Sequence, residues 1–164
     1  MSQQAALHWQ WSTFANLSVT EMYALLRLRS AVFVVEQNCV FQDLDGADAQ
    51  AMHLLGFAAQ SSAGSVAQPQ QALLAYARCF PPGVKFAEAS IGRVLTAPGV
   101  RGSGLGHALM DRAVTAVCTQ WGAQPIRIGA QAQLAGFYAG HGFVDQGRPY
   151  IEDGIAHLEM LRTP

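Results

Sequence analysis

The sequence has 164 residues, a formal net charge of −1, and 51% hydrophobic and 13% charged residues, which is typical of a globular protein with a buried core. Lys85 is the only lysine, so no broad basic surface is expected and nucleic acid is excluded as a partner. Because no segment approaches the roughly 18 uninterrupted apolar residues of a membrane helix, and the N-terminal segment lacks a secretory signal pattern, we expect a cytoplasmic protein with no membrane partner.

The first part of the chain is predicted to form a strand, a helix and a loop. Residues 7–13 alternate between apolar and polar side chains, as a strand does. Ser18-Val19-Thr20-Glu21 matches a capping box, so a helix is expected to begin near Ser18. Its later turns carry Arg27 and Arg29, where positive charge suits the helix dipole. Residues 37–50 are then expected to form a polar, acidic loop.

Three strands are expected next. Residues 52–60 and 72–80 are predicted to form an antiparallel hairpin, joined by a connector at 61–71 that has the composition of a loop. A third strand at 89–98 ends at Pro98 and leads directly into a glycine-rich stretch. The glycines therefore stand between a strand and the next helix.

A long helix is expected after Gly106. Apolar residues recur at spacings of three and four up to Trp121, and Gly122 is placed to end the helix. No internal repeat or second domain is visible, so residues 1–164 are interpreted as one domain. The remaining predicted elements are a strand at 125–130, a short helix at 133–142, a strand at 143–147 and a last strand at 155–161.

Neither the cysteines nor the acidic loop predicts a metal site. The three cysteines form no CxxC pair, which argues against a disulfide framework and a zinc site. Asp43, Asp45 and Asp48 have the spacing D-x-D-G-x-D, which differs from an EF-hand loop, and Leu54 stands at the twelfth position where that loop has glutamate. We interpret these aspartates as a solvated acidic loop and expect no metal.

Three glycines, Gly102, Gly104 and Gly106, alternate directly ahead of the long helix. Backbone N–H groups at a helix N-terminus carry partial positive charge, and a turn without Cβ atoms lets a pyrophosphate approach them. Two nucleotide-binding loops are excluded: a Walker loop needs Gly-Lys-Ser/Thr, and a dinucleotide fingerprint needs GxGxxG with an acidic residue ~20 positions later. The glycines therefore follow a different pattern from either of these loops.

The segment Arg101-Gly102-Ser103-Gly104-Leu105-Gly106 has the form Arg/Gln-x-x-Gly-x-Gly/Ala and resembles the pyrophosphate loop of the GNAT superfamily of acyl-CoA-dependent N-acyltransferases. The order of strands and helices, and the late Phe137-Tyr138 pair, are similar to that superfamily over most of the chain. A closer likeness, to the ElaA-like branch, lies in residues 27–48, His53, 136–143 and 149–160, although Val40-Phe41 stands where that branch has Pro-Tyr.

The resemblance implies a fold and a cosubstrate. The fold would be an α/β GNAT fold, with a mixed, mostly antiparallel central sheet of six to seven strands, about four flanking helices, and a splayed strand pair that holds the cofactor. The cosubstrate would be acetyl-CoA, with its pantetheine arm along strand 92–96 and its thioester carbonyl on the Leu95 amide. The implied cofactor-binding residues are Val94, Leu95, Arg101, Gly102, Ser103, Gly104, Leu105 and Gly106.

The implied reaction is transfer of an acetyl group to a primary amine by direct attack in a ternary complex. Tyr138 occupies the family position whose phenol protonates the leaving thiolate, and the alternative is that Tyr138 only packs. Because a CoA thiolate is already a fair leaving group, we expect this acid to contribute at the low end of the usual ~100- to 10,000-fold.

The general base stays open. Glu36, His53 and Glu152 lie in the segments that mark the ElaA-like branch, and we take them as candidates. Glu88 and His157 are also eligible, but Glu88 does not fall on the family position for a glutamate base. The alternatives are a structural role for His53, an ion pair between Glu36 and Arg29, and deprotonation relayed by water.

Other functions remain open at this stage. A non-catalytic acyl-CoA-binding or regulatory module would keep the glycine loop and lose the acid, whereas an interaction module without a cofactor would leave the three glycines unexplained. If the acidic loop borders the acceptor site, its carboxylates would favour a cationic amine, either a small molecule or a peptide. Both a monomer and a homodimer are compatible with the sequence.

Overall fold

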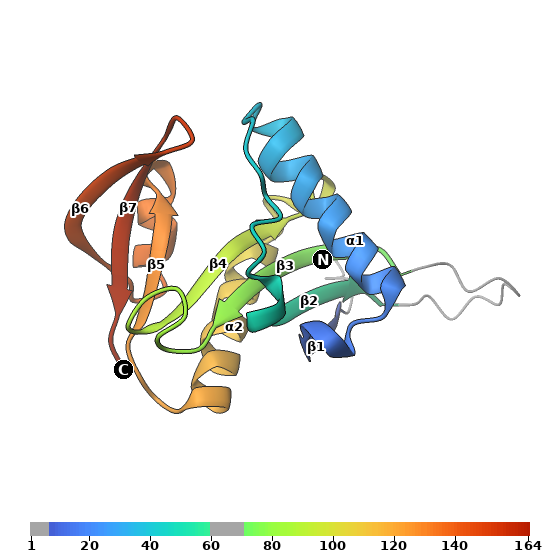
Figure 1. Cartoon of the computed structure of the whole chain (residues 1–164), viewed down its shortest axis with the longest axis horizontal. Coiled ribbons are helices and arrows are strands. Elements are labelled where there is room, and N and C mark those ends of the chain that lie inside the picture. Colours follow the sequence, from blue (N-terminus) through green and yellow to red (C-terminus); the bar gives the residue numbers. More distant parts are fainter. Residues whose placement is uncertain (1–6, 60–70) are drawn as a thin grey trace, which may run out of the picture.

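The computed structural model describes residues 7–59 and 71–164, so most of the connector predicted at 61–71 lies outside the described residues. Seven strands form one sheet in the order β1-β2-β3-β4-β5-β7-β6 (Figure 1). The α/β fold class predicted from the sequence is confirmed. The strands are β1 (Leu7–Thr13), β2 (Met52–Ala58), β3 (Leu73–Phe80), β4 (Ala89–Thr96), β5 (Ile126–Gln131), β6 (Val144–Glu152) and β7 (Ile155–Arg162).

The described residues contain three α-helices, which roughly match the four or so that were predicted. Helix α1 (Val19–Arg29) begins at Ser18, whose hydroxyl accepts from the Glu21 N–H at 3.2 Å while the Glu21 carboxylate accepts from the Ser18 N–H at 2.8 Å. The helix continues as a π-helix over Ser30–Glu36. The other helices are α2 (Leu105–Trp121) and α3 (Ala135–Ala139), with 3₁₀ turns at Phe14–Asn16, Asp48–Gln50, Pro98–Val100 and Ala132–Leu134.

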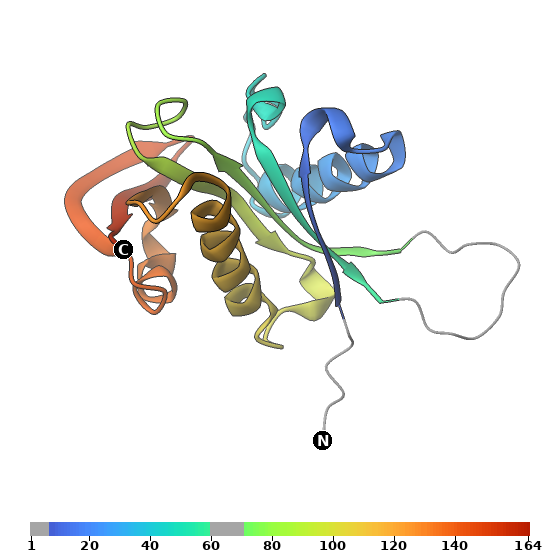
Figure 2. The same ribbon diagram turned by 90° about the horizontal axis from the view of Figure 1, so that it is seen from below.

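Two apolar cores lie on opposite faces of the sheet. Helix α2 covers one face, where Leu109, Met110 and Ala113 are fully buried against β3, β4 and β5. Helix α1 covers the other face, where Leu25 and Tyr76 are fully buried. Figure 2 shows the two helices on either side of the strands. No helix among the described residues is long and apolar enough to cross a membrane.

The last hairpin is longer than its sequence pattern indicates. The strand predicted at 143–147 runs on to Glu152, past Gly147 and Pro149, where its register with β7 shifts. Proline lacks a backbone donor and is tolerated where one side of a strand has no partner. Strand β6 is such an edge, so Pro149 does not end it.

Strands β4 and β5 are the only parallel pair of the described sheet, and they separate soon after they meet. Only Ala89 with Ile126 and Ser90 with Arg127 are in register, and the two strands then diverge (Figure 1). Beyond this point the sheet is split into a β1–β4 part and a β5–β7–β6 part. This split places a cleft in the middle of the sheet.

Candidate active site

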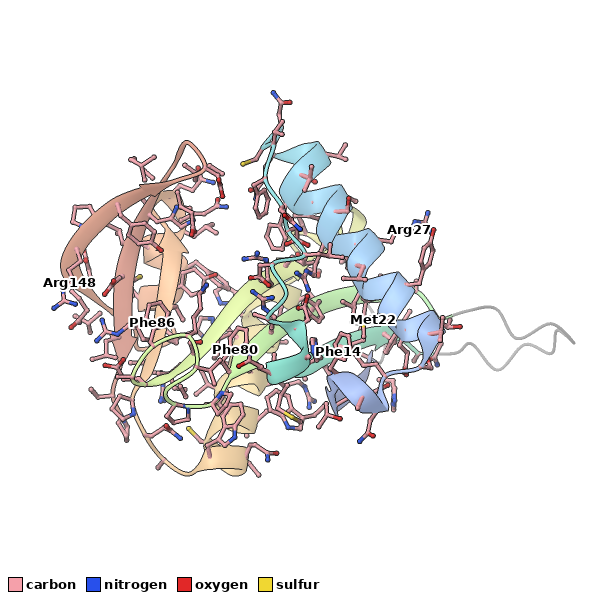
Figure 3. All side chains as sticks on the ribbon, in the orientation of Figure 1. Phe14, Met22, Arg27, Phe80, Phe86 and Arg148 are labelled. Carbon is pink, nitrogen blue, oxygen red and sulfur yellow. The ribbon has the colours of Figure 1, made fainter. Side chains whose placement is uncertain are left out.

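The cleft between β4 and β5 has a volume of about 730 Å³. Its walls come from the diverging strands, from α3, from β7 and from the end of the π-helix, and Phe80 and Phe86 lie at the end near the β3–β4 turn (Figure 3). No group of three or more metal-ligating side chains occurs within residues 7–59 and 71–164. The candidate residues that line the cleft are Glu36, Val94, Leu95, Arg101, Gly106, Tyr138 and Glu152, together with His157.

The glycine loop presents unpaired backbone N–H groups at the start of α2. Gly102 and Gly104 have φ angles of +78° and +84°, which glycine adopts without strain. Gly104 caps α2 without a side-chain hydrogen bond, and the first helical bond runs from the Ala108 N–H to the Gly104 carbonyl at 3.2 Å. A Cβ at Gly102 or Gly104 would meet no atom within 4 Å. The loop, with Ser103 and Leu105, therefore fits a pyrophosphate.

Arg101 and Glu36 form an ion pair beside this loop. The Arg101 guanidinium donates to both Glu36 carboxylate oxygens, at 2.6 and 3.2 Å. Glu36 therefore pairs with Arg101, and not with Arg29 as the sequence allowed. Both side chains are about 40% exposed, and exposed ion pairs contribute about 1 kcal/mol or less. An incoming phosphate can thus replace Glu36 as the partner of Arg101 at low cost.

A β-bulge bends β4 where it lines the cleft. Tyr76 of β3 faces Leu95, and Arg78 faces Gly92, so β4 has one extra residue between these pairs. Arg93 lies within this bulge with φ +50°, a conformation that costs a non-glycine residue about 1–3 kcal/mol. Its guanidinium Nε donates to Asp43 at 2.7 Å, which anchors the bulge to the acidic loop.

Two of the three aspartates in the acidic loop are buried and only Asp45 is exposed, so the prediction that all three are solvated is wrong. Asp43 and Asp48 are only 3% and 8% exposed. They belong to a buried ion-pair network in which Arg29 bonds Asp43 at 2.9 Å and Asp48 at 2.7 Å. The loop presents little unpaired charge to a cationic acceptor. The network consists of Arg29, Asp43, Asp45, Asp48, Arg78 and Arg93.

The arginines keep the network ionised. Burial alone would raise the pKa of Asp48, but hydrogen bonds and charge from Arg29 and Arg78 lower it below its ordinary value. The hydrogen bond from Arg78 likewise lowers the pKa of Asp45. Because the three arginines come from α1, β3 and β4, the network fastens the loop to both the helix and the sheet.

His53 lies outside the cleft, and its environment does not support the role of a base. The side chain is fully buried, its Nε2 lies 2.9 Å from the Asp48 carbonyl, and its Nδ1 lies 2.7 Å from the Tyr76 hydroxyl. A carbonyl only accepts, so Nε2 carries the proton and Nδ1 accepts from Tyr76. Burial lowers the pKa of His53, which favours a neutral, structural imidazole.

This buried histidine predicts acid sensitivity. The pKa of His53 is lowered in the folded state, so below pH ~6.5 the unfolded chain binds a proton that the folded chain excludes. The free energy of unfolding should fall as the pH drops from 7 to 5, by at most about 1.4 kcal/mol per pH unit for one proton. Urea unfolding at several pH values measures this slope. Replacing His53 by Gln should flatten it, and an unchanged slope would contradict the assignment.

Tyr138 reaches the cleft from α3. The ring is 8% exposed and packs edge-on against Phe137 and Phe143, with centroid distances of 5.1 and 6.1 Å. Burial raises the pKa of Tyr138 to about 12. The phenol is therefore protonated at neutral pH, fixed in position by aromatic packing, and able to donate a hydrogen bond into the cleft.

The two remaining carboxylate candidates for the general base differ in how far other side chains already engage them. Glu88 accepts two hydrogen bonds from Arg127, at 2.9 and 2.7 Å, which lower its pKa to about 2. Glu152 on β6 lines the cleft with 60% of its side chain exposed and lies 3.9 Å from His157 Nε2. Sequence analysis did not pair Glu152 with His157, because the two residues meet through the β6–β7 register.

Comparison with known proteins agrees with this arrangement. The family model for the acetyltransferase (GNAT) domain matches residues 47–163. Protein ElaA of Escherichia coli is 39% identical over 158 residues, which cover 95% of this chain and 96% of ElaA. A UPF0039 protein of Synechocystis sp. is 38% identical over 159 residues, 96% of this chain and 97% of the relative.

Among solved structures, the crystal structure of an acyl-CoA N-acyltransferase from Pseudomonas aeruginosa is 39% identical. It covers 96% of this chain and 100% of its own, with a TM-score of 0.84. These matches span the splayed strands, the glycine loop and the last hairpin alike. The chain therefore belongs to the GNAT family of acetyltransferases.

Proposed function

We propose that this protein transfers an acetyl group from acetyl-CoA to a primary amine by direct attack in a ternary complex. The observation that carries the proposal is one continuous cleft that extends from Arg101 and Gly106, at the two ends of the glycine loop, past the bulged β4 to the Tyr138 ring. A cleft of about 730 Å³ has room for a thioester arm and an acceptor together.

The chain's own groups would divide the work as follows. The N–H groups at the start of α2 and the Arg101 guanidinium hold the pyrophosphate. The open edge of β4 binds the pantetheine arm as an added strand would, with Val94 and Leu95 alongside it. The Leu95 N–H then donates to the thioester carbonyl oxygen as negative charge develops there. Tyr138 donates its proton, or a strong hydrogen bond, to the departing sulfur.

Calorimetric titration with acetyl-CoA tests the cofactor site. The Gly104→Ala variant places a side chain in the loop at φ +84°, where alanine is strained, and should weaken acetyl-CoA binding by tenfold or more. Gly122→Ala is the matched control, because Gly122 has φ +85° and open surroundings at the opposite end of the same helix. It should cost stability and leave the affinity within about twofold.

Two results would count against the proposal. No binding by the unmodified protein would discard an acyl-CoA-dependent activity altogether. Equal losses in Gly104→Ala and Gly122→Ala would show that the loop does not hold the pyrophosphate. The alternative of a non-catalytic acyl-CoA-binding module predicts tight binding without transfer, so the titration is followed by a panel of primary amines comprising polyamines, amino acids and dipeptides with a free N-terminus.

A further inference from the structure

We propose that the imidazole of His157 is the general base that accepts the proton of the acceptor amine; this inference rests on the transfer reaction proposed above. His157 lies on β7, in the row where Gln131 of β5 and Tyr150 of β6 are its cross-strand neighbours. It lines the cleft on the β5–β7–β6 side, across from β4, and its side chain is 11% exposed. An acceptor entering between the two parts of the sheet passes this row.

The hydrogen bonding of His157 leaves its basic nitrogen free. Nδ1 lies 2.8 Å from the carbonyl oxygen of Ile155. A carbonyl can only accept, so the proton of the neutral ring sits on Nδ1 and the lone pair is on Nε2. The nearest acidic oxygen, of Glu152, lies 3.9 Å from Nε2, which is too far for a hydrogen bond. Nε2 is thus available to a substrate, with a carboxylate close enough to stabilise the imidazolium.

Stacking against a tyrosine holds the His157 ring in one orientation. Tyr150 stacks on His157 with a centroid distance of 5.2 Å and an interplanar angle of 21°. The Tyr150 hydroxyl extends to the backbone of Gly129 on β5, where any Cβ would collide with it. Gly129 therefore makes room for the tyrosine that clamps the imidazole, which explains a glycine inside a strand. A clamped imidazole with a fixed tautomer is what proton abstraction requires.

The titratable and polar groups around His157 come from three strands and one turn. Tyr150 and Glu152 face it from β6, and Asp153 lies in the turn before β7. Glu159, two residues along β7, is paired with Arg127 of β5 at 3.0 Å. Gln131, its neighbour on β5, does not titrate. Of these groups, only Glu152 approaches Nε2 closely enough to appear among the ion pairs.

Three of the other four candidate bases are already engaged in hydrogen bonds. Glu36 is held by two hydrogen bonds from Arg101, and Glu88 by two from Arg127. His53 is fully buried, and both of its ring nitrogens are hydrogen-bonded. His157 combines a place in the cleft, a fixed tautomer and an unbonded ring nitrogen. The sequence showed it only as one eligible residue among five.

The protons and electrons of the proposed acetyl-transfer step balance. The amine lone pair attacks the thioester carbon and forms the C–N bond, and the proton lost by the amine nitrogen moves to His157 Nε2. The C–S bond breaks, and the sulfur leaves with the electron pair as a thiolate that accepts a hydrogen bond from the Tyr138 hydroxyl. The imidazolium then gives its proton to water and the thiolate takes one from water, so the net products are the amide and CoA.

The test uses His157→Gln, with His8→Gln as the matched control on the exposed face of β1. Because the cleft is open to water, which can relay part of the proton transfer, we expect kcat/KM for the acceptor to fall about 10- to 100-fold, with the acetyl-CoA affinity within about twofold of the unmodified protein. The control should change neither value. Both variants are assayed with acetyl-CoA and one amine that the panel identifies.

The pH profile separates a base from a structural histidine. The kcat/KM profile should have an acid limb that stays at the same pH for two acceptors of different amine pKa, and His157→Gln should lose this limb. A limb that moves with the acceptor, or that persists in the variant, overturns the base and leaves the transferase standing. A protein that binds acetyl-CoA and acetylates no amine of the panel overturns both.

Discussion

Replacing Arg29 by methionine should lower the free energy of unfolding by about 3–5 kcal/mol. Arg29 is fully buried and neutralises Asp43 and Asp48 at 2.9 and 2.7 Å. Methionine has a similar length and is apolar, so it fills the space but leaves the two carboxylates short of a charge partner. An uncompensated buried charge is one of the costliest single changes in a protein. Urea denaturation followed by circular dichroism at pH 7 measures the loss.

Arg27→Met is the matched control. Arg27 lies on the same helix, two residues earlier, and its side chain points away from the sheet (Figure 3). Its replacement should change the free energy of unfolding by no more than about 0.5 kcal/mol. If Arg29→Met lowers the free energy of unfolding by less than about 1 kcal/mol, then Arg78 and Arg93 neutralise the aspartates without Arg29. In that case Arg29 is not needed to hold the acidic loop to the helix.

The network matters for the cleft as well as for stability. The acidic loop itself contributes Cys39 and Phe41 to the cleft wall, and Arg93 joins the loop to the bulge of β4. A loosened loop therefore frees both the wall and the strand whose open edge is the proposed pantetheine site. Partial loss of acetyl-CoA affinity should accompany the loss of stability in Arg29→Met.

Local patterns in the sequence predicted most of the individual helices and strands, and the resemblance to a family predicted their fold. The capping box at Ser18, the strand-like alternations and the glycine loop each depend on neighbouring residues, and the structure has all of them. The ion-pair network depends on partners up to 50 residues apart, such as Asp43 and Arg93. A signal for it existed, since Arg29 stands four residues after the buried Leu25, on the same helical face.

The candidate site was only partly visible in the sequence. The resemblance to a family loop pointed to the cofactor end, because that end is one continuous segment. The proposed acceptor end is assembled by the β5–β7–β6 register, which brings Tyr150, His157 and Gly129 together from three strands. Nor does a sequence show which ring nitrogen of a histidine carries the proton. That choice follows here from one backbone carbonyl, that of Ile155.

Replacing Tyr138 by phenylalanine should lower kcat about 100-fold and leave the acetyl-CoA affinity within about twofold. Phenylalanine keeps the edge-on contacts with Phe137 and Phe143 and removes only the hydroxyl. The pKa of about 12 makes this phenol a weaker acid than a thiol of reference pKa ~8.5. Because the phenol pKa lies roughly 3–4 units above the thiol pKa, proton transfer from Tyr138 to a free thiolate is unfavourable. The hydroxyl therefore acts mainly by hydrogen-bonding the sulfur as charge develops there.

Because Tyr138 is expected to hydrogen-bond the sulfur without full proton transfer, the loss of kcat in Tyr138→Phe should lie at the low end of the ~100- to 10,000-fold range for general acid catalysis. Steady-state assays with acetyl-CoA and an accepted amine measure kcat, and calorimetry measures acetyl-CoA binding. Tyr23→Phe, on the exposed face of α1, is the control and should leave both values unchanged. An unchanged kcat in Tyr138→Phe would reduce Tyr138 to a packing residue. A loss well above 1,000-fold would instead mean that acetyl-CoA binding lowers the phenol pKa enough for full proton transfer.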